Sequence, residues 1–82
     1  MKKIGKVNHF YGNIGVAIIE LSDKLAVGDK VKFVHGDKEV EQTVNSMQME
    51  HKEVDSAKKG DTVGVKVDQK IGDGVEVYLV EE

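Results

Sequence analysis

The chain has 82 residues, no cysteine, and a formal net charge of −3 from 12 basic and 15 acidic side chains. Without cysteine it can form neither disulfides nor thiolate metal sites, and no apolar run approaches the roughly 20 residues that span a bilayer. All the basic residues are lysine, and the net acidity gives no long-range attraction for nucleic acid. We therefore expect one small cytoplasmic domain over residues 1–82, with no membrane segment.

The first half of the chain shows strand patterns. The run of residues 16–19, Val-Ala-Ile-Ile, is apolar at every position, which predicts a central strand covered on both faces. Val31 and Phe33 alternate with lysines, which is the period of a strand. Residues 35–38, His-Gly-Asp-Lys, then predict a tight hairpin connection. Ile4, Val7 or Val80, near the two ends of the chain, are candidates for an unpaired edge strand that mediates dimerisation.

The longest candidate strand covers residues 38–49. Val40, Gln42 and Val44 fit one inward register, whereas Met47 and Met49 fit the other. A shift of one residue is what a β-bulge produces, so we predict a bulge near residues 45–46. Small barrels use bulges to turn corners, and the shift therefore favours closure over a flat sheet.

The last third contains two more alternating segments, at residues 63–67 and 75–79. Residues 50–59 have too few apolar positions for more than one helical turn or an irregular loop. The sequence Gly-Asp-x-Val occurs three times, beginning at Gly28, Gly60 and Gly72, and predicts turns in which glycine takes a positive φ. Together these patterns predict an all-β fold, a small closed β-barrel of about six to seven antiparallel strands.

No catalytic constellation is apparent. The histidines, His9, His35 and His51, lie on separate segments without the spacing of a zinc site. No serine lies in a nucleophile elbow, and no glycine-rich loop has the pattern of a nucleotide-binding P-loop. We therefore expect no enzymatic activity, no metal, no cofactor and no nucleotide binding by this chain.

Lysines gather in the segment around residues 51–67, at Lys52, Lys58, Lys59 and Lys66. Such a cluster can contact phosphates, although each contact is weak and sensitive to salt. Acidic residues interleave with these lysines, and an ordinary solvated surface is the alternative interpretation.

Residues 47–65 contain a Met-ended strand, a basic stretch and then Val54-x-x-Ala57-x-x-Gly60-Asp61-x-Val63-Gly64-Val65. This pattern, with the earlier turn at residues 27–31, resembles the second β-barrel domain of elongation factor Tu and its relatives, over roughly residues 4–80. The resemblance implies a translation-factor domain-2 fold without a GTPase domain. In that family, the positions of His51 and Thr62 are associated with the pocket for the aminoacyl end of tRNA.

The resemblance implies a non-catalytic translation-factor-like binding module that contacts tRNA, ribosomal RNA or a translation-associated protein. The candidate binding residues are His51, Lys52, Lys58, Lys59, Thr62 and Lys66. The alternative is a protein-interaction or accessory domain of a larger enzyme system, with no role in RNA binding. Net acidity and the absence of arginine favour this alternative.

Overall fold

A computed structural model describes residues 2–50 and 52–80. The described chain forms ten strands and no α-helix. The strands are β1 (Lys2–Tyr11), β2 (Val16–Leu21), β3 (Leu25–Ala26), β4 (Lys30–His35), β5 (Lys38–Thr43), β6 (Met47–Met49), β7 (Lys52–Val54), β8 (Ser56–Ala57), β9 (Thr62–Lys66) and β10 (Glu76–Leu79). Within these residues, no helix has the length and apolarity needed to span a membrane.

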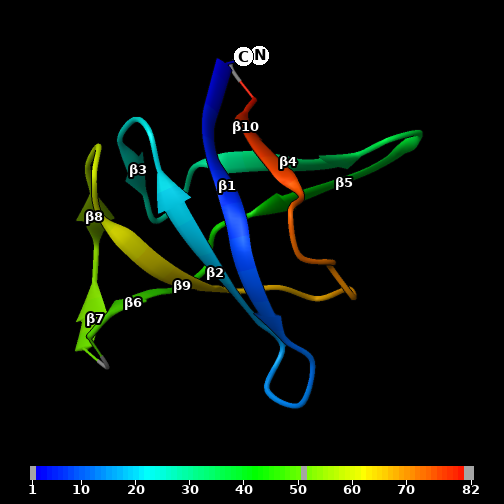
Figure 1. Ribbon diagram of the computed structural model, residues 1–82. Coiled ribbons are helices and arrows are strands. Elements are labelled where there is room, and N and C mark those ends of the chain that lie inside the picture. The colour runs from blue at the N-terminus through cyan, green and yellow to red at the C-terminus, as the bar shows by residue number, and fades with distance from the viewer. Residues whose placement is uncertain (1, 51, 81–82) are drawn as a thin grey trace.

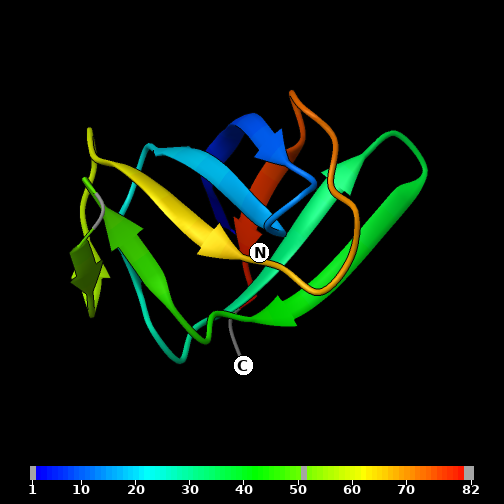
Figure 2. The same ribbon diagram turned by 90° about the horizontal axis from the view of Figure 1, so that it is seen from below.

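Eight strands form one antiparallel sheet in the order β5-β4-β10-β1-β2-β9-β6-β7, and β3 pairs with β8 in a second, two-stranded sheet (Figure 1). The first and last strands of the chain are neighbours in the middle of the large sheet, with Lys2 opposite Leu79. The register of β1 shifts between Lys3 and Gly5 against β10, and between Val7 and His9 against β2. Such irregularities bend a strand, and the sheet curls around its own inner face (Figure 2).

The core lies inside this curl. Alternate residues of the strands point inward, so the period-two pattern of the sequence becomes one apolar face. Phe33 is the largest fully buried side chain, and valine supplies much of the remainder. The largest fully buried side chains are Ile4, Val7, Ile19, Leu25, Val31, Phe33, Val44, Met47, Val63, Val65 and Val77.

The expected closed barrel of six to seven strands is not found. The hydrogen-bonded order of the described strands ends at β5 on one side and at β7 on the other, so the large sheet is open. The side chain of Gln42 spans part of the gap, because its Nε2 donates to the carbonyl of Lys66 at 2.6 Å and its Oε1 accepts from the amide of Asp68 at 3.1 Å. A side chain therefore links β5 to the end of β9 where strand pairing does not.

Residues 38–49 form two strands, and the predicted bulge near residues 45–46 is wrong. The chain leaves the ladder after Thr43, where the amide of Val44 donates to the carbonyl of Asp29 at 2.8 Å. This detour changes which parity faces inward, so Val44 and Met47 are both buried although they are an odd number of positions, three, apart. The inward register of Gln42 is confirmed, since this side chain is 9% exposed.

Two further expectations are corrected. Residues 50–59 do not form a helical turn or a loop alone, because β7 and β8 lie within this segment and β8 pairs with β3. Ile4 and Val7 do not lie on an unpaired edge strand, because β1 is hydrogen-bonded to β10 and β2 and both side chains are fully buried. Tertiary pairing overrides the weak local patterns in both places.

The glycine turns are largely as predicted. Gly28 and Gly60 have φ of 99° and 92°, and the following Asp29 and Asp61 accept hydrogen bonds from backbone amides three residues earlier. In the third repeat, positive φ occurs at Gly74 instead of Gly72. The hairpin at residues 35–38 is confirmed as the connection between β4 and β5.

Candidate interaction surface

The outer face of β2, β6 and β9 carries a groove of about 410 Å³. We call it the Ile14 groove. Its apolar wall consists of Tyr11, Ile14, Val16 and Ile18, and its polar side consists of Gln48, Glu50 and Thr62. Gly64 lies at the floor, next to Val63, whose side chain belongs to the core. Tyr11 and Ile14 are 48% and 63% exposed, which makes Ile14 the most exposed large apolar side chain among the described residues.

Local backbone geometry holds Ile14 in solvent. It lies in the turn between β1 and β2, where the amides of Ile14 and Gly15 both donate to the carbonyl of Tyr11, at 3.2 and 2.9 Å. Gly15 completes the turn with φ of 65°, a conformation that glycine adopts without a steric penalty. The turn therefore projects an apolar side chain beyond the end of the sheet.

The floor of the groove depends on Gly64. It pairs with Ile18 across β2 and β9, and a Cβ atom placed there would lie 3.1 Å from Val16 Cγ1 and 3.4 Å from Ile18 Cδ1. The two aliphatic side chains thus lean over the position that a larger residue would fill. The result is a shallow apolar floor on the outside of the sheet.

The polar side of the Ile14 groove includes an unusual backbone conformation. Glu50 has φ of 52° and is the one residue other than glycine with positive φ in residues 2–50 and 52–80. It lies at the turn that leads from β6 into β7. A carboxylate, an amide and a hydroxyl, from Glu50, Gln48 and Thr62, therefore border the apolar wall. Such an arrangement suits contact with another surface.

The run at residues 16–19 belongs to a central strand as predicted, since β2 lies between β1 and β9. Its cover is one-sided, however, because Ala17 and Ile19 are fully buried whereas Val16 and Ile18 remain half-buried in the groove. The outward-facing apolar residues Val16 and Ile18 were the signal in the sequence that indicated this surface. Sequence reasoning missed Tyr11, Ile14, Gln48 and Gly64.

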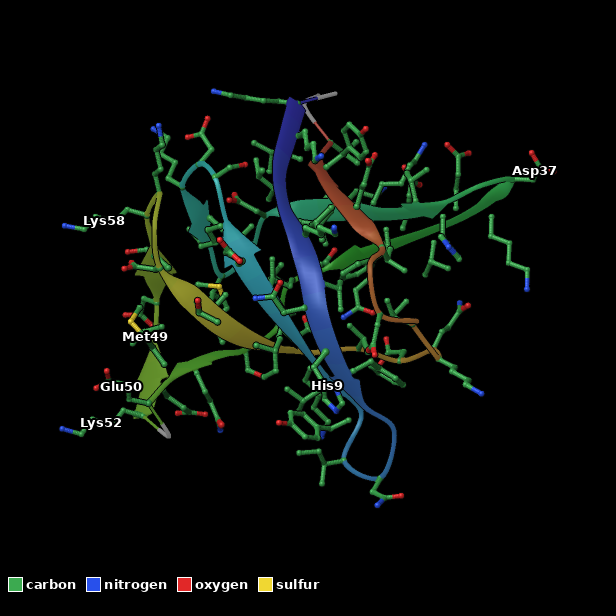
Figure 3. All side chains as sticks on the ribbon, viewed as in Figure 1. His9, Asp37, Met49, Glu50, Lys52 and Lys58 are labelled. Atoms are coloured by element: carbon green, nitrogen blue, oxygen red, sulfur yellow. The ribbon has the colours of Figure 1, made fainter. Side chains whose placement is uncertain are left out.

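The predicted binding residues do not converge. Thr62 lines the Ile14 groove, but Lys52, Lys58, Lys59 and Lys66 do not. Figure 3 shows Lys52 and Lys58 pointing outward on the same side of the molecule, with Met49 and Glu50 between them in this view. His51 lies outside the described residues. Contact with RNA through these lysines stays a prediction.

The remaining histidines occupy exposed positions. The ring of His9 contacts that of Tyr11 edge-on, with centroids 4.3 Å apart, and its Nδ1 lies 3.9 Å from an oxygen of Asp73. Asp73 also accepts a hydrogen bond from the amide of Phe10 at 2.9 Å, which fixes the loop before β10 to β1. Among the described residues, no group of three or more histidine or acidic side chains is placed to hold a metal ion.

Two carboxyl groups have perturbed pKa values, and neither lines the groove. The hydrogen bond from Lys2 lowers the pKa of Asp23, and the hydrogen bond from the hydroxyl of Tyr78 lowers the pKa of Glu76. The same bond to Glu76 raises the pKa of Tyr78. Glu76 and Tyr78 lie on β10 and Asp23 lies between β2 and β3, and all three are partly exposed, which is typical of surface ion pairs and hydrogen bonds.

Comparison with known proteins found a curated relative and similar solved structures. No family model matches the chain. It is 43% identical over 81 residues to an uncharacterized protease of Methanocaldococcus jannaschii, and the match covers 98% of this chain but only 20% of that protein. The chain therefore spans about a fifth of the length of this relative.

Two solved structures share the fold. Both are the C-terminal domain of a candidate U32 peptidase from Geobacillus thermoleovorans, one of them a selenomethionine variant. The variant has a TM-score of 0.89 and 20% identity, covering 95% of this chain and 99% of that domain. The other has a TM-score of 0.90 and 19% identity, covering 98% and 93%.

These findings overturn the resemblance to elongation factor Tu. The relatives found are a protease and a peptidase domain, not translation-factor domains. The assignment to the translation-factor family is therefore wrong, and the relatives do not support a translation role. Turn chemistry explains the error, because Gly-Asp-x-Val describes a turn entering a strand and recurs wherever a small β-domain needs one.

Proposed function

We propose that this chain is a non-catalytic accessory domain that docks onto the main body of a U32-type protease through the Ile14 groove. The observation that carries the proposal is the exposed apolar groove on a domain matching only a fifth of a protease at 43% identity. The expectation of an accessory domain of a larger enzyme system thus becomes the preferred function.

The chemistry of the groove supports docking. Large exposed apolar side chains next to polar groups are typical of protein contact surfaces, and aromatic residues are enriched at their centres. Tyr11 supplies a ring and Ile14 a branched aliphatic side chain, both at the rim where a partner can cover them. Neither is needed for the core, since the inward parity of β1 and β2 fills it.

The occupant that we assign to the groove is the rest of a protease chain. The M. jannaschii relative joins a matching segment to four times as much further sequence, so in that protein the domain has a large covalent neighbour. Catalysis would reside in that neighbour, because the described residues of this chain offer a contact surface without a paired nucleophile and base.

The direct test is binding in trans. The M. jannaschii protease without its matching fifth is immobilised, and this chain is added in solution. Saturable binding is expected. Ile14→Ser should weaken it by about 10- to 100-fold, since burial of such a side chain is worth about 1.5–3 kcal/mol.

Val27→Ser is the matched control, because Val27 is 40% exposed and does not line the groove. It should leave the affinity unchanged. Failure of this chain to bind, or equal weakening by both substitutions, would contradict the proposal.

A further inference from the structure

A second groove, of about 320 Å³, lies at the far end of the β4–β5 hairpin, where the hairpin faces the segment that precedes β10. We call it the Lys70 groove. Its floor is apolar, formed by Phe33, Ile71 and Val75, which are at most 3% exposed, and by the half-buried Val40. Its rim is cationic or titratable, formed by His35, Lys38 and Lys70.

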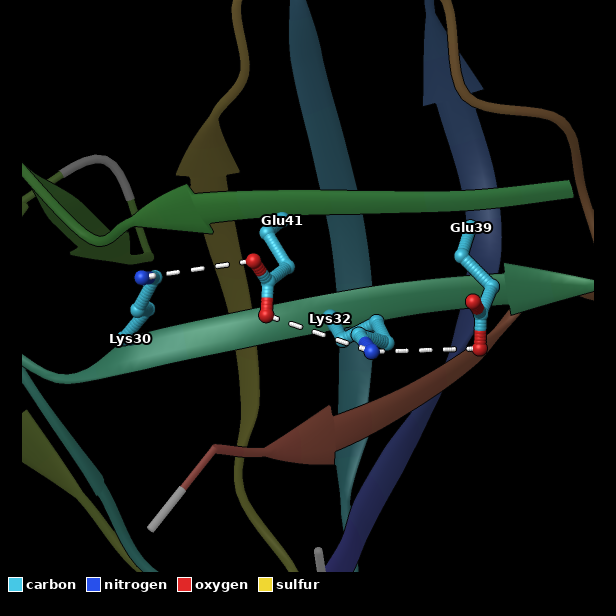
Figure 4. Close-up of polar contacts among 4 residues, drawn as sticks. All are labelled: Lys30, Lys32, Glu39 and Glu41. Carbon is cyan, nitrogen blue, oxygen red and sulfur yellow. Dashed lines mark ion pairs between the residues drawn. The ribbon is translucent and has the colours of Figure 1, made fainter. Parts of the chain in front are cut away.

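The two faces of the hairpin differ in how their lysines are neutralised. On the outer face, Lys32 Nζ lies 3.8 Å from Glu39 and 3.9 Å from Glu41, and Lys30 Nζ lies 4.0 Å from Glu41 (Figure 4). This ladder follows from the register, since Lys32 is directly opposite Glu41 on β5. The outer face therefore balances its own charge.

The rim of the Lys70 groove has no such balance. Lys38 and Lys70 make no ion pair with any residue in the described part of the chain, and the lining contains no carboxylate. Asp37 lies at the extreme tip of the hairpin and is not part of the lining (Figure 3). An apolar floor with two uncompensated ammonium groups is complementary to a ligand that is apolar and anionic.

The backbone beside the groove is also available. β5 is an edge strand, so alternate residues direct their N–H and C=O groups away from β4 without a strand partner. An extended peptide can add to such an edge, gaining affinity from main-chain hydrogen bonds and specificity from alternate side chains. The alternate side chains of an added strand would point to the groove side, near Val40 and Lys38.

We propose that the Lys70 groove binds an extended peptide segment that carries an apolar side chain flanked by carboxylates. The apolar side chain packs against Phe33, Val40 and Ile71. The flanking carboxylates pair with Lys38 and Lys70, while the peptide backbone extends the sheet at β5. This inference goes beyond the docking of a protease body, because it uses a different surface and does not require that partner.

Fluorescence anisotropy measures the binding of a short labelled peptide at low ionic strength. In this peptide every second residue is Thr, and the residues between them are Glu, Val and Glu. The comparison peptide has Lys in place of each Glu. The acidic peptide should bind, and the basic peptide should not. Equal binding of the two peptides, or of neither, would overturn the proposal.

Charge reversal locates the site. Lys38→Glu combined with Lys70→Glu should weaken binding by about tenfold or more, whereas Lys58→Glu combined with Lys59→Glu makes the same charge change far from the groove and should cause only the small loss expected from net charge. Thermal unfolding of both variants checks that they fold. If the first pair unfolds, Lys70→Gln alone serves, because Lys70 is exposed and outside the strands.

Amide chemical shifts provide a second readout. Addition of the acidic peptide should shift the signals of Glu39, Glu41 and Ile71, and leave those of Ile14 and Gly64 unmoved. Shifts confined to the Ile14 groove would contradict the assignment. Because peptide binding and protease docking are measured at separate surfaces, one can fail while the other holds.

Discussion

Gln42 and Lys66 are joined by a hydrogen bond of 2.6 Å from a side-chain amide to a backbone carbonyl, across 24 positions of sequence. The same side chain accepts from the amide of Asp68 at 3.1 Å. Gln42 thus presents one donor and one acceptor, as a neighbouring strand would, at a place where β5 has no strand partner. The open sheet is held together there by one residue.

Substitution of Gln42 by Ala should lower the free energy of unfolding by about 2 kcal/mol, because a carbonyl and an amide in a partly buried site lose their partners. Urea denaturation measures the change.

Gln42→Glu tests the two hydrogen bonds separately, since a carboxylate can accept from the amide of Asp68 but cannot donate to the carbonyl of Lys66. It should be destabilising at neutral pH, and less so when the carboxyl is protonated. Thr43→Ala, at the exposed next position, is the control and should change stability little.

Gly5 is a site where only glycine fits. A Cβ atom there would lie 2.6 Å from the carbonyl oxygen of Glu20 and 2.9 Å from Ile19 Cγ2, and the first of these belongs to the backbone of a paired strand. Gly5→Ala should therefore reduce stability by about 1–3 kcal/mol. In Gly12→Ala the nearest atom would be 3.6 Å away, so a loss no larger than about 0.5 kcal/mol is expected. Similar melting temperatures for the two variants would show that β1 can move.

Gly64→Ala should weaken docking with only a modest loss of stability. The added methyl group meets the side-chain atoms of Val16 and Ile18 that form the floor of the Ile14 groove, and these can shift slightly. We expect a loss of about 1 kcal/mol in stability and a clear drop in affinity for the protease body. Gly72→Ala, whose nearest contact would be 4.0 Å away, should affect neither docking nor stability. Unchanged docking in Gly64→Ala would argue against this groove.

The pair of Glu76 and Tyr78 predicts a pH dependence. The hydroxyl of Tyr78 donates to Glu76 at 2.8 Å, and Lys3 lies 3.5 Å from the other carboxylate oxygen. These contacts lower the pKa of Glu76, so their contribution to stability is present above the ordinary carboxyl pKa and is lost as pH falls through the lowered value. Glu76→Gln should therefore show a smaller loss of stability on acidification, measured by urea unfolding across a pH series.

Tyr78 predicts the opposite pH dependence of stability, at alkaline pH. The hydrogen bond to Glu76 raises the pKa of Tyr78, so this contribution is present below the ordinary phenol pKa and is lost as pH rises through the raised value. In a Tyr11→Phe background, ultraviolet absorbance follows Tyr78 alone. Glu76→Gln should move its titration to lower pH, and an unmoved titration would mean that the bond does not persist in solution.

Local patterns predicted much of the fold. The alternation at residues 63–67 and 75–79 located buried faces, and the turns at Gly28 and Gly60 were identified because positive φ is a property of a few residue types. The inward register of Gln42 was also visible in the sequence. Its two hydrogen bonds were not, because their partners lie more than twenty positions away and their approach depends on the curl of the whole sheet.

The strand order and the candidate site could not be predicted from the sequence either, because both depend on contacts between residues that are distant in sequence. Nothing local indicates that β10 inserts between β1 and β4, or that residues 52–57 pair as strands. In the sequence, Ile14 is a single apolar residue in a turn. Only the folded structure brings it beside Val16, Ile18 and Gly64 in one groove. The lysine cluster was evident in the sequence, but in the structure Lys52, Lys58, Lys59 and Lys66 do not line the Ile14 groove.

The pairing of β1 with β10 has a consequence for biosynthesis. β1 is synthesised before β10 but pairs with it, since Lys2 is opposite Leu79. β4 also pairs with β10. During translation, β1 and β4 expose unpaired edges until residues near 79 leave the ribosome. Closure of such long-range contacts is slow, so we expect this domain to fold only after β10 has been synthesised.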